Sequence, residues 1–189
     1  MKVAGRNPTS LFDGVGINYV LFVQGCNHRC PHCHNPSTWD FNGGVDMPIA
    51  DIQADIKRFL PLISGLTLSG GDPVYQLDDA IALARWAKTI DLKVTLYTGF
   101  ELNQIQLPSP SPFDFIIDGC FEFERTDDCA FRGSSNQKVW SRFGDKHYSN
   151  ISACVDFLDS ALYLRPYKIS SFQRDQKRAL VSDSSGRSG

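Results

Sequence analysis

Three cysteines stand close together early in the chain, where residues 25–35 read GCNHRCPHCHN. Their spacing is C-x3-C-x2-C, so Cys26, Cys30 and Cys33 lie on one short segment. A structural zinc ion needs four ligands, so a histidine of this loop would have to complete the set. A 4Fe–4S cluster has four irons, and three thiolates leave one iron open, as a catalytic centre requires. The spacing therefore favours an iron–sulfur cluster, with a zinc site or unligated thiols as alternatives.

The segments that must position this loop alternate between strands and helices. Short apolar runs rich in β-branched and aromatic residues indicate strands buried on both faces. The expected strands cover residues 19–23, 66–69, 93–97 and 113–117, with a further strand at 138–140. Apolar residues at spacings of three or four predict helices over 49–63 and 77–87, and a short helix is expected over 101–106. Strands that alternate with helices through short connections predict an α/β fold with a parallel sheet.

Each unusual local sequence follows one of these strands. The cysteine loop follows the first strand, Gly70-Gly71-Asp72-Pro73 the second, Thr98-Gly99 the third and Asp118-Gly119 the fourth. The carboxyl ends of parallel strands share one edge of the sheet, where α/β proteins bind their ligands. We therefore expect one site built from these four loops.

The composition excludes several classes of protein. The 19 Lys and Arg residues and the 21 Asp and Glu residues leave a net charge of −2, so the chain cannot hold nucleic acid mainly by bulk positive charge. Apolar residues make up 42% and charged residues 21%, which is ordinary globular usage. No apolar run reaches the roughly 18 residues of a membrane span, and residues 1–10 carry no secretory signal. Six cysteines without an export signal should be reduced or bind metal, which predicts a cytoplasmic protein.

The length predicts one domain with an extension. The chain has 189 residues, a little more than the roughly 150 that a domain typically holds. We expect a domain over residues 1–150 and a C-terminal extension over residues 151–189. After about residue 170 the chain is rich in Ser, Arg, Lys, Asp and Gly, so this tail is predicted to be disordered.

The cysteine loop and the glycine turn together resemble the radical S-adenosylmethionine (SAM) enzymes. More narrowly, five strings of residues resemble the anaerobic ribonucleotide reductase activating proteins, which are glycyl-radical activases. These strings are CHNPSTW at 33–39, LTLSGGDP at 66–73, YTGF at 97–100, IDG at 117–119 and RGSSNQ at 132–137. The resemblance runs from about Leu11 to Trp140, and the string at 132–137 is its most family-specific part.

The resemblance implies a 4Fe–4S cluster on Cys26, Cys30 and Cys33, with SAM bound at the open iron. It implies that an electron from the reduced cluster cleaves SAM and that the resulting 5′-deoxyadenosyl radical abstracts a hydrogen atom. The residues that it places against SAM are His32, Cys33, His34, Gly70, Gly71, Asp72 and Asp118. The implied fold is a partial (β/α) barrel of radical SAM type, because a full barrel typically needs about 250 residues.

The implied substrate is a glycine Cα on the large chain of anaerobic ribonucleoside-triphosphate reductase. An oligomer with the reductase and a flavodoxin-like electron donor are further implied partners, whereas neither nucleic acid nor a membrane is expected. A radical SAM enzyme for another substrate is the alternative within the same chemistry. A non-catalytic, zinc-stabilised binding module is the alternative from a different class.

Several of these residues also have plain structural interpretations. The glycine pair by itself indicates a tight turn. His32 is interpreted either as a ring near the adenine or as an exposed loop residue, and His28 is expected at the surface. The thiols outside the loop lack the spacing of ligands and are expected to be free; they are Cys120, Cys129 and Cys154.

Some positions depart from the family pattern or have two interpretations. Related activases carry a lysine where this chain has Cys120, and tend to carry Pro and Arg where it has Val15 and Asn18. The changes at 15 and 18 are expected to affect partner docking or the entry loop rather than the chemistry. Asp118 is either a SAM contact or a capping carboxylate. The string at 132–137 is either a surface turn or a site where Arg132 meets a carboxylate.

Overall fold

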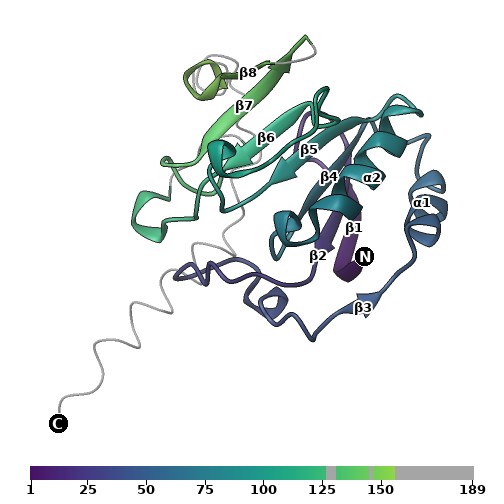
Figure 1. Cartoon of the computed structure of the whole chain (residues 1–189), viewed down its shortest axis with the longest axis horizontal. Coiled ribbons are helices and arrows are strands. Elements are labelled where there is room, and N and C mark those ends of the chain that lie inside the picture. Colours follow the sequence, from purple (N-terminus) through teal and green to yellow (C-terminus); the bar gives the residue numbers. More distant parts are fainter. Residues whose placement is uncertain (127–130, 145–146, 156–189) are drawn as a thin grey trace.

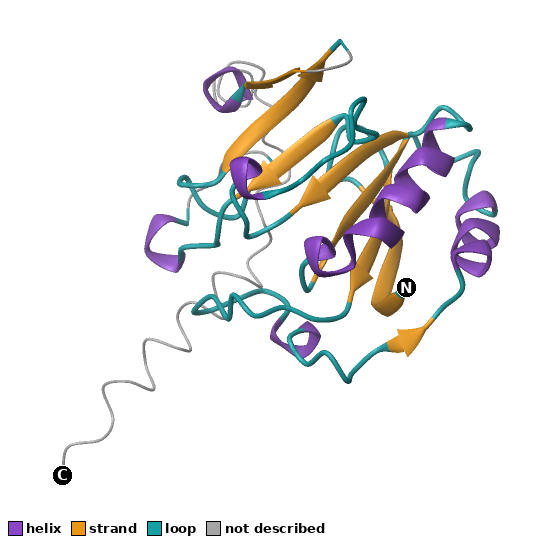
Figure 2. Cartoon of the chain, viewed as in Figure 1, coloured by secondary structure: helices purple, strands orange, loops and turns teal. Residues whose placement is uncertain are grey.

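One mixed sheet of eight strands forms the framework of the chain (Figures 1 and 2). The computed structural model describes residues 1–126, 131–144 and 147–155. The strand order across the sheet is β3-β1-β2-β4-β5-β6-β7-β8. The strands are β1 (Lys2–Ser10), β2 (Asn18–Val23), β3 (Val45–Asp46), β4 (Gly65–Gly70), β5 (Lys93–Tyr97), β6 (Phe115–Asp118), β7 (Lys138–Phe143) and β8 (His147–Asn150).

The four central strands run parallel to one another. β2 pairs with β4, β4 with β5, and β5 with β6, all in parallel. Their register aligns Tyr19 with Leu66 and Leu66 with Val94, so buried apolar side chains of three strands form one layer. All five expected strands are confirmed, although the fourth begins at Phe115 rather than Phe113.

The outer strands are antiparallel, so the expectation of a wholly parallel sheet is wrong at both edges. β1 pairs antiparallel with β2 and β3, and β7 pairs antiparallel with β6 and β8. A parallel pair needs a crossover of about a dozen residues or more, whereas the loops from β1 to β2 and from β7 to β8 are short. Among the described residues no pairing joins β3 to β8, so the fold is mixed α/β with an open sheet.

Two helices, α1 (Ile49–Lys57) and α2 (Leu77–Lys88), pack with the central strands around one core (Figure 2). Ile52 and Ile56 come from α1, and Leu83 comes from α2. Burial of each such side chain contributes about 1.5–3 kcal/mol. The helix expected over residues 49–63 ends at Lys57, and the chain continues in tighter turns, in which Phe59 N donates to Ile56 O and Leu60 N donates to Lys57 O.

The other short elements are 3-10 turns beside the strand ends. They are η1 (Pro36–Thr38), η2 (Pro73–Gln76), η3 (Leu102–Gln104) and η4 (Phe123–Arg125). The short helix expected over 101–106 is therefore the single turn η3, in which the side chains of Glu101 and Gln104 form a capping box. The expected disordered tail and Cys129 lie outside the described residues, and the division at residue 150 stays a prediction.

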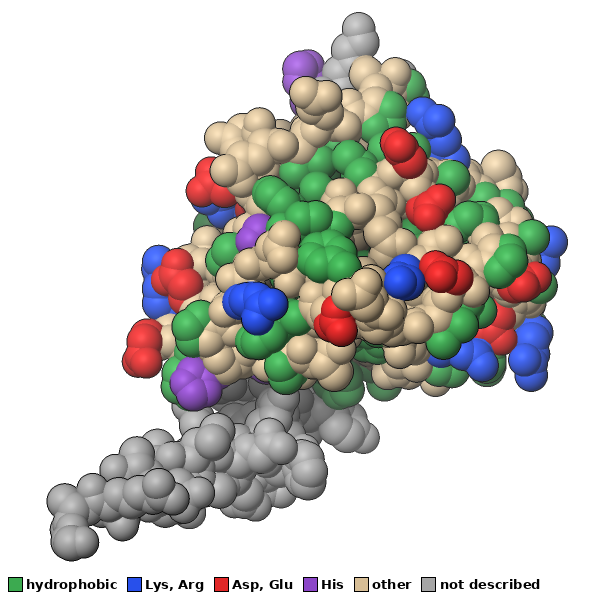
Figure 3. Space-filling view, turned by 60° about the horizontal axis from the view of Figure 1, so that its bottom comes forward, with side chains coloured by type: hydrophobic (Ala, Val, Ile, Leu, Met, Phe, Trp, Pro, Cys, Tyr) green, Lys and Arg blue, Asp and Glu red, His purple; other side chains and the backbone are tan. Residues whose placement is uncertain are grey.

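The surface carries charges of both signs. On the face shown in Figure 3, Lys and Arg side chains alternate with Asp and Glu, and hydrophobic side chains lie between them. The described residues of this face form no continuous basic patch, which agrees with the net charge of −2. In the part of the chain that the structure describes, neither helix has the length and apolar character of a membrane-crossing segment.

Candidate metal centre and cofactor site

The carboxyl ends of the parallel strands lie at one edge of the sheet, as their arrowheads show (Figure 1). The loops after β2 and β4 meet there, because the backbone N–H of Asp72 donates to Gly25 O at 2.9 Å. The loop after β5 joins them, since Thr98 Oγ1 lies 3.0 Å from both carboxylate oxygens of Asp72. The loop after β6 is connected by Gly119 N, which donates to Phe100 O at 3.2 Å. The expected convergence of four loops is therefore confirmed.

The cysteine loop carries its thiols at different depths. Cys26 is 8% exposed, whereas Cys30 and Cys33 are half-buried. Cys33 N donates to Cys30 O at 3.1 Å, and Asn35 N donates to Cys33 Sγ at 3.4 Å. Hydrogen bonds from N–H groups to ligand sulfurs tune iron–sulfur sites, because they stabilise negative charge on sulfur. The loop therefore offers thiol ligands, one of which accepts a backbone hydrogen bond of the kind found at iron–sulfur sites.

The number of loop thiols matches a 4Fe–4S cluster that keeps one iron open. Across the described residues, no three His, Cys, Asp or Glu side chains are placed to hold one ion. A structural zinc site needs four ligands that converge on one ion. Each thiolate of a 4Fe–4S cluster binds a different iron, so its sulfurs stand apart. Cys26, Cys30 and Cys33 are the residues that would hold such a cluster.

The environment of Cys26 opposes its ionisation. Burial raises the pKa of this thiol and the negative charge of Asp72 adds to the effect, whereas the backbone N–H groups of His28 and Arg29 lower the pKa. The thiolate, not the thiol, is the metal ligand. If Cys26 binds iron, it would release a proton on binding, which would favour cluster assembly at higher pH.

Gly70, at the end of β4, and Gly71, directly after it, lie where the backbone packs too closely for any side chain. Gly70 has φ +104°, and a Cβ there would lie 2.5 Å from Val23 N. A Cβ on Gly71 would lie 2.5 Å from Gly25 O, at the root of the cysteine loop. The tight-turn interpretation therefore accounts for both glycines. Their contact with SAM stays a prediction.

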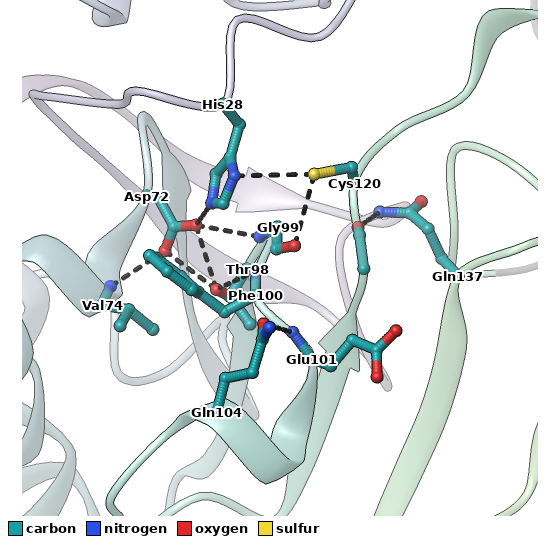
Figure 4. A network of polar contacts seen from close by, with 11 residues as sticks. His28, Asp72, Val74, Thr98, Gly99, Phe100, Glu101, Gln104, Cys120 and Gln137 are labelled. Atoms are coloured by element: carbon teal, nitrogen blue, oxygen red, sulfur yellow. Dashed lines mark hydrogen bonds and ion pairs between the residues drawn. The ribbon is translucent and has the colours of Figure 1, made fainter.

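Asp72 is the centre of the polar network in Figure 4. The residue is 1% exposed, and its Oδ1 accepts from Val74 N at 2.9 Å. Its Oδ2 accepts from Gly99 N at 2.9 Å, and the Thr98 hydroxyl bonds to the same carboxylate. These donors offset the cost of burying a negative charge. Asp72 therefore joins the ends of β4 and β5, and its predicted contact with SAM is untested.

His28 was expected at the surface, and that expectation is wrong. Its side chain is 16% exposed, and its Nε2 lies 2.9 Å from Asp72 Oδ2. Its ring lies edge-on to Phe100, with centroids 4.6 Å apart. The signal that could have found it is its place between two cysteines that must lie against the edge of the sheet. The contact itself joins residues 44 positions apart.

The other two histidines of the loop face the segment that follows β6. The His32 ring lies 4.1 Å from that of Phe123, and the His34 ring lies 4.8 Å from that of Phe121, centroid to centroid. His32 has φ +57°, which is unusual for a residue other than glycine. His32 and His34 are both exposed, which agrees with the interpretation of His32 as an exposed loop residue, and their contacts with SAM stay predictions.

Asp118 and Cys120 end the fourth parallel strand. Asp118 is 1% exposed, and its Oδ2 accepts from Leu102 N at 2.7 Å, so the capping interpretation is confirmed. The sulfur of Cys120 lies 3.5 Å from His28 Nδ1 and 3.4 Å from Gly99 O (Figure 4). Partial burial of this sulfur, with the negative charge of the neighbouring loop thiols, raises the pKa of Cys120 to about 11. Cys120 and Cys154 are free thiols, as expected.

The string at 132–137 supports the segment after β6. Gln137 Oε1 accepts from Gly133 N at 2.9 Å, while its Nε2 donates to Gly119 O at 2.8 Å. Asn136 Nδ2 donates to Cys120 O at 2.8 Å. The sequence showed that these residues are family-specific but not what they do. The structure assigns them the task of holding the loop that carries Cys120.

An open, mixed sheet with a three-cysteine loop at its parallel edge defines a class of iron–sulfur protein. The family model described as "4Fe-4S single cluster domain" matches residues 12–140. The anaerobic ribonucleoside-triphosphate reductase-activating protein of Enterobacteria phage T4 is 34% identical over 142 residues, covering 71% of this chain and 90% of that protein. The chain therefore belongs to the family of anaerobic ribonucleoside-triphosphate reductase-activating proteins.

Bacterial relatives show the same likeness. The protein of this name from Haemophilus influenzae is 36% identical over 143 residues, covering 70% of this chain and 92% of the relative. That of Escherichia coli K12 is 34% identical over 148 residues, covering 70% of this chain and 93% of the relative. The similarity thus spans nearly the whole of these relatives and all four loops of the site.

Proposed function

We propose that this chain activates an anaerobic ribonucleoside-triphosphate reductase by radical SAM chemistry and generates a glycyl radical on its large chain. Membership of the family supports the activating role. The observation that carries the chemistry is the contact between the cysteine loop and the glycine turn, made by Asp72 N and Gly25 O at 2.9 Å. This contact places the residues proposed for the cluster beside those proposed for SAM.

The chain's own residues divide the work of this site. When bound, the cluster and SAM supply a 5′-deoxyadenosyl radical that can take a hydrogen atom from a glycine Cα. Cys26, Cys30 and Cys33 would hold the cluster and would leave one iron available to SAM. Backbone carbonyl groups of the turn at 70–73 are proposed to accept hydrogen bonds from the amino group of SAM, whereas the missing Cβ atoms of Gly70 and Gly71 leave room for the backbone of Val23 and Gly25. The residues proposed to line the SAM site are His32, Cys33, His34, Gly70, Gly71, Asp72 and Asp118.

Two of these residues act through the loops that they hold. Asp72 and Asp118 are each 1% exposed and accept hydrogen bonds from the chain itself. In this proposal Asp72 positions the glycine turn, and Asp118 positions the segment that begins at Leu102. In this proposal the exposed rings of His32 and His34, which lie against Phe123 and Phe121, offer flat surfaces for the adenine.

The open sheet suits a protein substrate. We interpret it as the partial barrel of the radical SAM enzymes, with the carboxyl edge of β2, β4, β5 and β6 accessible to a loop of the reductase. A glycine Cα–H bond is weak, because the radical is shared with both flanking amides. The proposal includes a complex with the reductase, a flavodoxin-like electron donor and a cytoplasmic location.

The test combines the reduced protein, SAM and its cognate anaerobic reductase in the absence of oxygen. We expect the doublet of a carbon-centred glycyl radical in the electron paramagnetic resonance (EPR) spectrum of the reductase, together with 5′-deoxyadenosine. Replacing the radical glycine of the reductase with alanine should abolish the doublet but not the binding of SAM. The Cys33→Ala variant is the matched control on the activating chain, because it removes one proposed ligand.

Each other outcome rejects a different part of the proposal. Reductive cleavage of SAM without a radical on the reductase would retain radical SAM chemistry and reject this substrate. A full cluster that never cleaves SAM under strong reduction would reject both. A colourless preparation that binds zinc instead of iron would favour the non-catalytic binding module.

A further inference from the structure

A histidine inside the cysteine loop connects that loop to the sheet. His28 stands between two proposed cluster ligands, and its Nε2 lies 2.9 Å from Asp72 Oδ2. An ionised carboxylate only accepts hydrogen bonds, so His28 Nε2 carries a hydrogen and donates a hydrogen bond to Asp72. We propose that His28 is a positioning residue that holds the cysteine loop in register with the glycine turn. This inference rests on the proposed function, because it concerns how cluster and SAM are held together.

The carboxylate that His28 contacts is buried and accepts several other hydrogen bonds. Asp72 is 1% exposed and accepts from Val74 N at 2.9 Å and from Gly99 N at 2.9 Å. The Thr98 hydroxyl lies 3.0 Å from both of its oxygens. Val74 belongs to the segment after β4, and Thr98 and Gly99 follow β5. The His28 contact therefore adds the cysteine loop to an anchor that already joins two strand ends.

Residues of three loops surround the imidazole ring of His28. The Phe100 ring, labelled in Figure 4, lies edge-on to the His28 ring with centroids 4.6 Å apart. The Tyr75 ring lies 6.1 Å from the His28 ring, centroid to centroid. A Cβ on Gly99 would lie 2.6 Å from His28 Cδ2, so the glycine leaves the room that the ring occupies. The Cys120 sulfur lies 3.5 Å from Nδ1 on the opposite side. The ring thus contacts residues from three loops of the site.

The backbone of the cysteine loop needs such an external contact. Arg29, which follows His28, has φ +49°, and His32 has φ +57°. Left-handed backbone is unfavourable for residues other than glycine, and it persists only where surrounding contacts determine it. Backbone bonds hold the start of the loop, where Asp72 N donates to Gly25 O. The His28–Asp72 bond holds its middle, directly beside the strained residue.

The test compares two substitutions of one residue in the full chain. His28→Phe keeps a ring against Phe100 but removes the N–H group, whereas His28→Gln places an amide N–H near the position of Nε2. In the apoprotein, we expect faster amide hydrogen exchange over residues 26–35 in His28→Phe and near-normal exchange in His28→Gln. This measurement needs neither iron nor SAM.

The second readout is spectroscopic. After anaerobic reconstitution, both variants should bind iron and sulfide, because all three proposed ligands remain. SAM should still change the EPR spectrum of the reduced cluster in His28→Gln. In His28→Phe the same change should need at least about tenfold more SAM, which corresponds to about 1.4 kcal/mol. Combining His28→Phe with Asp72→Asn should be no worse than the more severe single change, since the two residues act through one bond.

The outcomes separate this inference from the proposed function. If the unsubstituted protein forms no cluster, or SAM leaves its spectrum unchanged, the proposed function fails. If the unsubstituted protein behaves as proposed and His28→Phe matches it in exchange and in SAM response, only the positioning role is overturned. The positioning role would also be overturned if His28→Phe and His28→Gln weakened the response to SAM equally. It would be overturned as well if the effects of His28→Phe and Asp72→Asn on that response were additive.

Discussion

Replacing Gly71 with alanine should force apart the turn after β4 and the start of the cysteine loop. A Cβ on Gly71 would lie 2.5 Å from Gly25 O and 2.9 Å from Gly25 N. Ordinary contacts of a Cβ begin at 3.4 Å, so the two backbones would have to separate by about 0.9 Å. Backbone atoms cannot rotate away as the end of a flexible side chain can. The whole root of the loop must therefore move.

The movement acts on a hydrogen bond in the same place, because Asp72 N donates to the Gly25 oxygen that the new methyl group approaches. Overpacking costs about 1–3 kcal/mol, and a lost backbone hydrogen bond costs about 0.5–1.5 kcal/mol. Alanine restricts the unfolded chain more than glycine does, which offsets about 0.4–1 kcal/mol. We expect Gly71→Ala to lower the free energy of unfolding by about 0.5–4 kcal/mol, with the middle of these terms at about 2 kcal/mol.

Urea unfolding of the apoprotein, followed by circular dichroism, measures this change. Iron and sulfide after anaerobic reconstitution should also fall, because the loop that carries the thiols is displaced. Gly5→Ala is the matched control, since no atom lies within 4 Å of a Cβ at that position. Its stability should equal or slightly exceed that of the unsubstituted chain. Normal stability and full iron content in Gly71→Ala would refute the reasoning.

Three further predictions concern single side chains. Cys33→Ala should lose cluster iron and sulfide, whereas Cys154→Ala should retain both, and equal losses would reject the ligand assignment. Asp118→Ala should destabilise the apoprotein by about 1.5–3 kcal/mol in urea unfolding, because Leu102 N loses a charged acceptor; an unchanged midpoint would contradict the capping role. Burial raises the pKa of Tyr148 to about 12. The folded state therefore favours the neutral phenol, so the contribution of Tyr148 to the free energy of unfolding is complete below about pH 10 and is lost as the pH rises toward 12. The slope of stability against pH in that range should be shallower in Tyr148→Phe, and an equal slope would reject this origin.

Local patterns predicted the elements of the centre well and those of the edges poorly. Runs of buried apolar residues have a strong signal, and all the expected strands are present. β1 (Lys2–Ser10) was missed, because Gly5 and Pro8 interrupt it and half its residues face solvent. β8 was missed because it is short and polar. Strand direction at the edges depends on how each loop returns, which local patterns do not encode.

The sequence alone determined which metal-ligating residues the site contains. The spacing of Cys26, Cys30 and Cys33 is a property of one short segment, and thiolates on such a segment can share a cluster wherever the loop lies. The glycine turn was likewise visible as a break after an apolar run. Its place one parallel strand away predicted that it would meet the cysteine loop, because the carboxyl ends of parallel strands share an edge.

Only the tertiary structure decided what the neighbouring residues do. A side chain at position 71 would clash with the backbone of Gly25, and His28 is largely covered, with its Nε2 lying 2.9 Å from Asp72 Oδ2. Asp72 in turn is held by donors from the next strand, including Gly99 N. These contacts join residues that are far apart in the chain, and their energies depend on distances of a few ångströms. Residue types indicate which bonds are available, but the packing of the strands selects the ones that form.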